Sequence, residues 1–356
     1  MIVTPFGTTA AGDEARLFTL RSGTGFTARV SDYGATLVEL HVPDRGGEFA
    51  DVVLGFDSVD GYASARNPYF GATIGRVANR IAHGTFVIAG DTYNLARNES
   101  PHHLHGGVSR SFDKVSWQVL EAGERHLKLR YLSAAGEEGY PGEVAATAEY
   151  RLTDDALVVE YQATTDVVTP VNMTNHAYFN LAGAGSGTIL DHELQVRADT
   201  YTEVDDELIP TGEVRPVDDT PLDFRSLRRI GERLGQLSVV PGALGYDHNF
   251  VLRDGVDASS PAAVLRDPVS GRILELSTDQ PCLQFYSGNR LDPPVDGKAG
   301  QQYGLHGALC LEPQRAPDAV NHPGFGAILL EPGSEYRHTS HYRFATGIED
   351  VMPHDD

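Results

Sequence analysis

The chain has 356 residues, which is long for one domain but common for a large all-β fold, and its 38 glycines and 20 prolines indicate many turns. Its net charge of −22 gives a surface that repels the phosphates of nucleic acid and is poorly suited to an anionic substrate. No long apolar stretch is present and the N-terminus turns polar after Pro5, so we expect a cytoplasmic protein without a membrane partner.

Short segments of alternating apolar and polar residues recur along the chain and predict β-strands. Examples are residues 26–33, 35–42, 126–133, 144–152 and 156–164. A turn sequence between the last two of these joins them into a predicted hairpin. Residues 222–237 carry a helical period instead, which Gly231 weakens.

The order of these elements predicts the fold class. A βαβ alternation is absent, which argues against a doubly wound parallel sheet. No Gly/Ser-rich or Pro-rich linker divides the chain, and it contains no internal repeat. We therefore predict an all-β protein, a large antiparallel β-sandwich with few short helices, forming one domain over residues 1–356.

The first candidate for ligand binding is GRVANRIAHGTF, in which Asn79 and Arg80 stand together before a strand-like stretch. A guanidinium beside an amide suits bidentate contacts to hydroxyl groups or to a carboxylate. A structural salt bridge is an equally good interpretation of Arg80, and the nearby Arg76 fits a structural role better.

The loop SPHHLHGG follows, with His102, His103 and His105. Its two glycines allow the backbone to approach a ligand closely. The pattern His103-x-His105 resembles the metal pair of cupin-type barrels, which continues with a glutamate about four residues on, whereas this chain has Ser109 and Arg110 there. Turn-forming histidines are the plainer interpretation, and we predict no metal.

The segment TNHAYFNL, residues 174–181, is unusually polar for a strand. Read as a strand, it places His176, Tyr178 and Asn180 on one face. An imidazole, a phenol and an amide in register suit contacts with a polar ligand. The alternative is that the three side chains satisfy one another inside the core.

Three later segments add further polar groups. Asp247 in GYDHNF could accept hydrogen bonds from paired sugar hydroxyls or from its own backbone. Gln284 in QPCLQFYSGN could face a cleft or lie in a core strand with its amide capped. Glu312 ends the apolar strand ALCLEPQ on the same face as Cys310, where burial would raise its pKa and make it a competent base near neutral pH. Cys282 and Cys310 lack the C-x-x-C spacing of a metal site, so we expect buried free thiols.

Together these residues offer two imidazoles, two carboxylates, an arginine and several amides and phenols. A phosphate loop, a nucleophile elbow and a metal quartet are all missing from the sequence. This inventory suits acid–base chemistry on a neutral, polyhydroxylated ligand.

With these motifs the chain resembles the aldose 1-epimerase (galactose mutarotase) family. The resemblance runs through SDYGATLVELHVPDR, DVVLGFDSVDGY, GRVANRIAHGTF, LHGG, GEEGYPG, TPVNMTNHAYFNL, GYDHNF, QFYSGN and LEPQRAPDAVNHPGF. Each motif alone is weak, but their common order is highly specific. The resemblance implies a galactose-mutarotase-like β-sandwich without metal or organic cofactor. It also implies interconversion of the α and β anomers of free aldohexoses such as glucose and galactose.

The resemblance also implies roles for individual residues. Glu312 matches the base that takes the proton of the C1 hydroxyl, His176 the acid that protonates the ring oxygen, and His105 a second imidazole at the same atoms. Because histidine ordinarily titrates near neutral pH, we expect His176 to be nearly unperturbed. The positions expected to hold or line the sugar are Asn79, Arg80, Asp247, Gln284 and Tyr178.

Some expectations stay open. His83, His102 and His103 depart from the residues expected at their positions, which leaves the preferred sugar undecided. The substrate is expected to be a small monosaccharide, and the protein a monomer or a homodimer. Two other classes of function fit parts of the pattern: a carbohydrate-binding protein without catalysis, and a glycosidase with Asp247 and Glu312 as its carboxylate pair.

Overall fold

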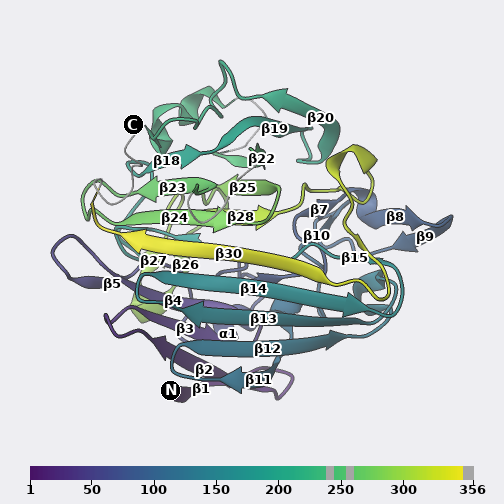
Figure 1. Ribbon diagram of the computed structural model, residues 1–356, viewed down its shortest axis with the longest axis horizontal. Helices are drawn as coiled ribbons and strands as arrows, with labels where there is room; N and C mark the ends of the chain where they lie inside the picture. Colours follow the sequence, from purple (N-terminus) through teal and green to yellow (C-terminus); the bar gives the residue numbers. More distant parts are fainter. Residues whose placement is uncertain (238–243, 254–259, 348–356) are drawn as a thin grey trace.

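The computed structural model describes residues 1–237, 244–253 and 260–347, and consists mainly of antiparallel strands in two layers (Figure 1). One layer is a nine-stranded sheet that crosses the whole molecule. Its strands, in spatial order, are β11 (Gln118–Ala122), β12 (His126–Ser133), β13 (Val144–Leu152), β14 (Ala156–Thr165), β30 (Tyr336–Ala345), β24 (Ile273–Thr278), β23 (Ala263–Arg266), β18 (Glu193–Val196) and β21 (Arg228–Arg229).

The second layer contains a five-stranded and a six-stranded sheet. The five-stranded sheet follows chain order: β1 (Ile2–Thr8), β2 (Glu14–Arg21), β3 (Thr27–Ser31), β4 (Thr36–Pro43) and β5 (Phe49–Asp51). The six-stranded sheet has the order β17 (Tyr178–Phe179), β28 (Leu309–Gln314), β25 (Cys282–Tyr286), β22 (Asp247–Leu252), β19 (Ala198–Val204) and β20 (Pro210–Pro216).

Backbone hydrogen bonds join these two sheets edge to edge. The N–H of Leu54 donates to the carbonyl of Tyr178 (2.9 Å), and the N–H of Asn180 donates to the carbonyl of Val52 (2.9 Å). The second layer is therefore nearly continuous. The main hydrophobic core lies between it and the nine-stranded sheet, and side chains from all three sheets contribute to that core.

Shorter elements fill the connections. Pairs of short strands form β6 (Thr73–Ile74) with β16 (Thr174–Asn175), β7 (Arg80–Ile81) with β10 (His103–Leu104), β8 (Thr85–Ile88) with β9 (Asp91–Asn94), β15 (Thr169–Pro170) with β29 (Leu329–Leu330), and β26 (Val295–Asp296) with β27 (Gln302–Tyr303). Helical turns are α1 (Val59–Ala63) and the 3-10 turns Ala82–Gly84, Phe112–Lys114, Glu137–Gly139, Ile230–Glu232, Leu234–Gln236, Lys298–Gly300 and Pro323–Phe325.

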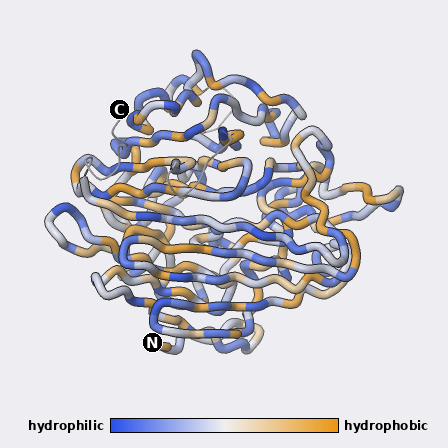
Figure 2. The backbone as a smooth tube through the Cα atoms, in the orientation of Figure 1, coloured by the Kyte–Doolittle hydropathy of each residue, from blue (hydrophilic) through white to orange (hydrophobic). Residues whose placement is uncertain are grey.

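The five predicted strand segments are confirmed as β3, β4, β12, β13 and β14, and in β13 the alternation also matches burial. In β13 the residues Val144, Ala146, Ala148, Tyr150 and Leu152 are buried, while the residues between them are more exposed. Figure 2 shows the same alternation of hydrophobic and hydrophilic residues along the strands of the nine-stranded sheet. The predicted hairpin is β13–β14, and the all-β sandwich with few short helices is the observed fold class.

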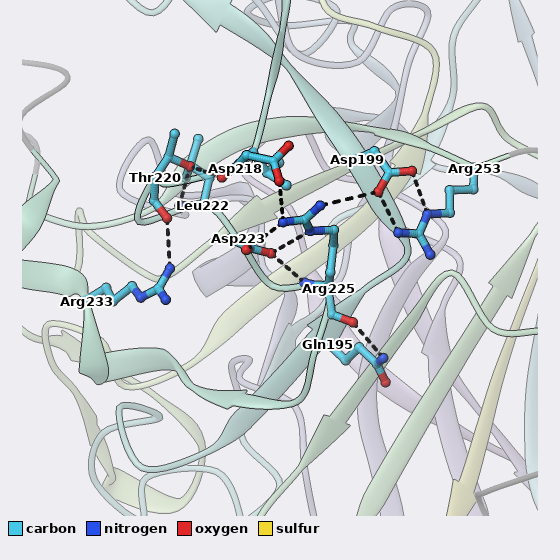
Figure 3. A network of polar contacts seen from close by, with 10 residues as sticks. Gln195, Asp199, Asp218, Thr220, Leu222, Asp223, Arg225, Arg233 and Arg253 are labelled. Atoms are coloured by element: carbon cyan, nitrogen blue, oxygen red, sulfur yellow. Dashed lines mark hydrogen bonds and ion pairs between the residues drawn. The ribbon is translucent and has the colours of Figure 1, made fainter.

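The predicted helix at 222–237 is wrong. The segment forms an extended loop, the two-residue strand β21 and two 3-10 turns. Two of its arginines bind groups outside the segment, as Figure 3 shows: Arg225 pairs with Asp218 (2.7 Å) and Asp199 (3.9 Å), and Arg233 donates to the carbonyl of Thr220 (2.9 Å). These tertiary contacts, together with the weak local propensity around Gly231, outweigh the helical period.

No helix within the described residues has the length and apolar character needed to cross a membrane.

A buried ammonium group fixes the loop before β27 to the five-stranded sheet. The Nζ of Lys298 donates to the carbonyls of Val38 (2.6 Å) and Val53 (2.8 Å) and to the carboxylate of Asp51 (2.5 Å). The side chain of Lys298 is only 8% exposed, so the lost bonds are not fully replaced by water when it is truncated.

We expect Lys298→Met to lower the free energy of unfolding by about 3 kcal/mol, because it leaves a partly buried carboxylate and two carbonyls without their donor. Urea denaturation would measure this. The matched control is Lys128→Met, whose ammonium pairs with Glu149 at 3.3 Å on a more exposed face and should cost less than about 1 kcal/mol. Equal losses in the two variants would contradict the assignment.

Candidate active site

Three adjacent strands of the six-stranded sheet place polar side chains next to one another. In the register of β22, β25 and β28, Asn249 lies opposite Gln284, and Gln284 lies opposite Glu312. Residues directly opposite in an antiparallel pair point to the same face, and Asp247 shares that face with Asn249 because the side-chain period is two. The sequence segments GYDHNF, QPCLQFYSGN and ALCLEPQ therefore converge on one surface.

Glu312 is buried on this face, as its position in the sequence predicted. It is only 2% exposed, its Oε2 atom has no hydrogen-bond partner within the described part of the chain, and its Oε1 lies 3.7 Å from Nε2 of His176. Burial raises the pKa of Glu312 well above its ordinary value, and the nearby carboxylate of Asp247 raises it further. Such a group holds a proton more tightly than an ordinary carboxyl and can exchange it with a neighbour.

The strand predicted for residues 174–181 is interrupted at His176. Residues 174–175 form β16, which pairs with β6, and residues 178–179 form β17, which pairs with β28. His176 sits where the chain changes partners, and its backbone bonds to Gly71 (3.0 Å) and Ala72 (2.9 Å). The chain leaves the short strand β6 at this point and joins β28 only from Tyr178 onward, although β28 itself runs on to Gln314 beside β25.

The three polar residues of this segment have different environments. His176 and Tyr178 still share a face, with their rings stacked at 5.2 Å. The Tyr178 hydroxyl donates to the carbonyl of Pro68 (3.0 Å), so this residue offers the site its ring. The amide of Asn180 donates to the carbonyls of Gly187 (3.0 Å) and Gly307 (2.9 Å) and braces the loops beneath the site.

His176 does not titrate near neutral pH, contrary to expectation. Burial lowers its pKa to about 4 because the charged imidazolium would lose its hydration. The other ring nitrogen, Nδ1, faces the thiol of Cys310 at 3.5 Å, and a thiol gives little support to a positive charge. Of the pair, Glu312 is therefore the member that holds the proton more tightly.

His105 is a fixed hydrogen-bond donor. Its Nδ1 accepts a hydrogen bond from the backbone N–H of Asn79 (3.1 Å), which places the hydrogen of the neutral ring on Nε2. Burial lowers the pKa of His105 well below its ordinary value, and the neighbouring His176 lowers it further. The two imidazole rings lie 5.1 Å apart, nearly perpendicular to each other.

Other residues of the SPHHLHGG loop support the fold and not the site. The side chain of His103 turns away from the site, between the carbonyl of Ala96 (2.6 Å) and the hydroxyl of Tyr140 (2.7 Å). A Cβ on Gly106 would lie 1.8 Å from the carbonyl oxygen of Gly75. The expectation that these glycines approach a ligand is therefore wrong for Gly106, which approaches the protein's own backbone.

His102 also has a structural environment. Its Nδ1 accepts a hydrogen bond from the N–H of His83 (3.0 Å), and its Nε2 lies 3.5 Å from the carboxylate of Glu207. Glu207 belongs to the turn between β19 and β20. The histidine thus links the loop of His105 to the edge of the six-stranded sheet.

The donor atoms of His105, His176 and Glu312 lie within 4.8 Å of one another, close enough for two imidazoles and a carboxylate to surround one small group. This set could hold a divalent cation, and it could equally surround the reacting atoms of an organic ligand. It arises from three distant segments. His103 and His105 do not form the metal pair of a cupin-type barrel. The side chain of His105 faces His176 and Glu312, whereas that of His103 faces Ala96 and Tyr140.

Beside this trio lies a small cavity of about 10 Å³, which has room for about one water molecule. It brings together four of the residues expected to bind a ligand with further residues from β19, β20 and their neighbours. Its lining consists of Asn79, Arg80, Thr202, Val204, Leu208, Pro210, Asp247, Asn249, Gln284 and Pro317.

Both interpretations of Arg80 apply at once. Its guanidinium lines the cavity and also pairs with Glu99, Nε to Oε2 at 2.9 Å. Glu99 in turn binds Arg290. Arg76 is structural, as expected, because its buried guanidinium donates to the carbonyls of residues 133, 134 and 141.

Asp247 bonds a neighbouring strand and not its own backbone turn. It accepts a hydrogen bond from Nε2 of Gln284 (2.6 Å), which leaves Oε1 of Gln284 without a partner among the described residues. Burial raises the pKa of Asp247. The Oε1 atom of Gln284 thus remains free to accept a hydrogen bond from a hydroxyl group.

Several residues of the site gave no signal in the sequence. Glu99 and Arg290 stand in loops without a recognisable motif. Thr202 and Leu208 reach the cavity only because β19 and β20 extend the sheet. Tyr69, whose ring lies 4.7 Å from the ring of His105, was also missed.

Comparison with known proteins places this geometry in context. The family model described as "Aldose 1-epimerase" matches residues 16–343. A "Galactose mutarotase" of Rattus norvegicus is 46% identical over 345 residues, covering 96% of this chain and 98% of the rat protein. An "Aldose 1-epimerase" of Escherichia coli (strain K12) is 37% identical over 336 residues, covering 94% of this chain and 96% of that protein. The solved structure of the GalM/aldose epimerase homologue from C. elegans superposes with a TM-score of 0.86 at 32% identity, covering 93% of this chain and 99% of that one.

The raised pKa of Glu312 predicts how its removal changes stability with pH. The folded protein holds this proton more tightly than the unfolded chain, so the carboxyl contributes stability at low pH and loses that contribution as the pH rises past its ordinary pKa. We expect Glu312→Gln to unfold at a higher temperature than the wild type, with the gain growing as the pH rises from the ordinary range of a carboxyl through neutrality.

Differential scanning calorimetry across this range would measure the effect. Glu121→Gln, which changes an exposed glutamate, serves as the control and should show no growing gain. A Glu312→Gln variant that is less stable than the wild type at the higher pH would contradict the buried, uncompensated carboxyl.

Proposed function

The chain belongs to the aldose 1-epimerase family, and we propose that its pocket interconverts the α and β anomers of a free aldohexose by acid–base ring opening and reclosure. The relatives are named galactose mutarotase and aldose 1-epimerase, and mutarotase activity is the function that this chain shares with them. One observation supports the proposal above the others: a buried carboxyl and a buried imidazole, 3.7 Å apart, adjoin a cavity lined by hydroxyl-binding side chains.

In the proposed reaction Glu312 removes the proton of the C1 hydroxyl while His176 delivers a proton to the ring oxygen. The C1–O5 bond breaks, and the aldehyde turns about the C1–C2 bond. Its opposite face then meets the C5 hydroxyl and the ring recloses, with the two groups in exchanged roles. The fixed Nε2–H of His105 steadies the oxygen on which charge develops.

Glu312 and His176 share one proton, and the proposed reaction needs that proton on His176 and not on Glu312. Neutral Glu312 with neutral His176 has the same net charge as ionised Glu312 with protonated His176. Passage between the two states moves one proton within the pair and takes none from solvent. The low pKa of His176 makes its protonated form a strong acid, and the high pKa of Glu312 makes its ionised form a strong base.

The remaining residues would bind the substrate. Asn79, Arg80, Asp247 and Gln284 line the cavity with donors and acceptors suited to sugar hydroxyls, and Tyr178 contributes the ring behind His176. Acid, base and donors are all side chains, so the proposed mechanism uses neither a metal nor an organic cofactor. Glucose and galactose are the proposed substrates.

We infer further that the protein acts in the cytoplasm as a monomer or a homodimer. Its buried thiols, Cys282 and Cys310, are free, which suits a reducing compartment. Light scattering coupled to size-exclusion chromatography would determine the oligomeric state. Nothing in the described part of the structure favours a glycosidase, or a binding protein without catalysis, over the function of the family.

The principal test is the mutarotation of freshly dissolved α-glucose and α-galactose, followed by polarimetry. We expect Glu312→Gln and His176→Ala each to lower the enzymatic rate by about 10²–10⁴-fold, since each removes one proton-transfer partner. His103→Gln is the control. It alters the nearby imidazole that faces Tyr140, outside the proposed active site, and should leave the rate close to that of the wild type. A wild type that does not exceed the spontaneous rate with any common aldose would refute the function.

The pH profile tests the proton inventory of the pair. Activity requires one proton shared by Glu312 and His176, so we expect kcat/KM, which reports the free enzyme, to rise as the pH passes about 4 and His176 gives up the second proton of the pair. It should fall only above the ordinary range of a carboxyl, where Glu312 loses the shared proton. After subtraction of the spontaneous reaction, a rise near pH 6.5 would show that His176 titrates unperturbed.

A further inference from the structure

Tyr69 lies over both imidazoles of the site. Its ring centroid is 4.7 Å from that of His105, in an edge-to-face arrangement, and 5.8 Å from that of His176. The ring also makes a cation–π contact with Lys114, whose Nζ lies 5.5 Å from the ring centroid. Tyr69 is partly exposed while the two histidines are buried, so it forms the outer member of a cluster of three rings.

The loop that carries Tyr69 is bonded to the segment that carries His176. The carbonyl of Pro68 accepts the hydroxyl of Tyr178 (3.0 Å), and the N–H of Gly71 donates to the carbonyl of His176 (3.0 Å). The amide of Asn175 also donates to the carbonyl of Gly71 (3.1 Å). These bonds come from both sides of Tyr69, so its ring and the imidazole of His176 move as one unit.

The backbone of Tyr69 is strained. Its φ is +68°, in the left-handed region, where a bulky residue costs about 1–2 kcal/mol relative to the usual conformation. A glycine would adopt this conformation without that cost, as Gly71 does nearby at φ +64°. An aromatic side chain in a position that favours glycine points to a functional contribution of the ring.

We propose that Tyr69 is a positioning residue of the mutarotase reaction, whose ring holds His105 and His176 in the orientation that faces Glu312 and screens them from water. This inference rests on the function proposed above. Tyr69 touches the imidazoles and acts through them. Misplacement of a proton-transfer group by about 1 Å can lower a rate by about 10²-fold, so the effect of losing the ring should fall on kcat.

The decisive variants are Tyr69→Gly, Tyr69→Leu and Tyr69→Phe. Tyr69→Phe keeps the ring and should keep kcat within about threefold of the wild type, while Tyr69→Gly should lower kcat by about 10–100-fold. KM should change much less, because the cavity residues Asn79, Arg80, Asp247 and Gln284 are untouched. Tyr69→Leu keeps the apolar bulk without the flat ring and should fall between the two.

Stability separates positioning from a structural role. In Tyr69→Gly the relief of backbone strain opposes the loss of ring contacts, so its melting temperature should stay close to that of the wild type while kcat falls. Ala89→Gly is the matched control: an exposed residue with φ +51° in the turn between β8 and β9, whose replacement relieves strain far from the site and should leave kcat unchanged. A kcat loss that merely follows a lower melting temperature would support a structural role and overturn the proposal.

An NMR measurement tests the orientation without catalysis. Cε1–H signals of His105 and His176, assigned through His105→Gln and His176→Ala, should lose their ring-current shifts and broaden in Tyr69→Gly but not in Tyr69→Phe. Unchanged signals, or a folded Tyr69→Gly variant with kcat within threefold of the wild type, would refute the positioning role. A wild type inactive on every aldose would instead refute the proposed function, whereas this spectrum would still show whether the ring holds the imidazoles.

Discussion

The register of β22, β25 and β28 is the constraint on which the site depends. Glu312, Gln284 and Asn249 are aligned because they are directly opposite one another in this sheet. The residues between them, such as Phe285 and Leu311, point the other way into the main core. A slip of one residue would expose these apolar side chains and bury the polar ones, so core packing enforces the alignment of the polar face. The site is thus a consequence of the same burial that stabilises the sandwich.

The imidazoles come from a different kind of structure. His105 and His176 stand at the ends of two-residue ladders, where the chain changes partners, and the nearby Tyr69, Asn79 and His105 all have left-handed backbone. Such conformations are uncommon outside glycine and persist only when the surroundings fix them. Here the surroundings are backbone bonds between neighbouring loops, such as the pair between Asn79 and His105. A regular sheet therefore supplies the carboxyl, and an irregular, tightly bonded rim supplies the donors.

This difference between the regular sheet and the irregular rim also explains how much of the structure could be predicted from the sequence. The strands and the inward Glu312 are legible because alternation and burial are local consequences of a period of two. The break at His176 is not, since it depends on where the chain leaves β6 and joins β28. The helical period at 222–237 predicted the wrong structure because Arg225 also pairs with Asp199 and Asp218, which lie outside the segment. Tyr69 and Glu99 carry no motif, and their roles arise from contacts between distant segments. Likewise, the low pKa of His176 follows from the depth of its burial, which no residue pattern states.

The buried pair carries a cost that the fold alone does not require. An isolated carboxyl with an unpartnered oxygen beside a dehydrated imidazole is unfavourable in either protonation state. A sandwich built for stability alone would place an apolar side chain at residue 312, as it does at Ala308 and Cys310 on the same face of the strand. The unfilled hydrogen-bonding capacity of Glu312 and Gln284 is complementary to a ligand that brings hydroxyl groups, and the sugar would complete these bonds on entry. Completed bonds favour the ionised carboxylate, so the ligand itself shifts the shared proton toward His176. Binding would in this way prepare the acid and the base at the moment both are needed.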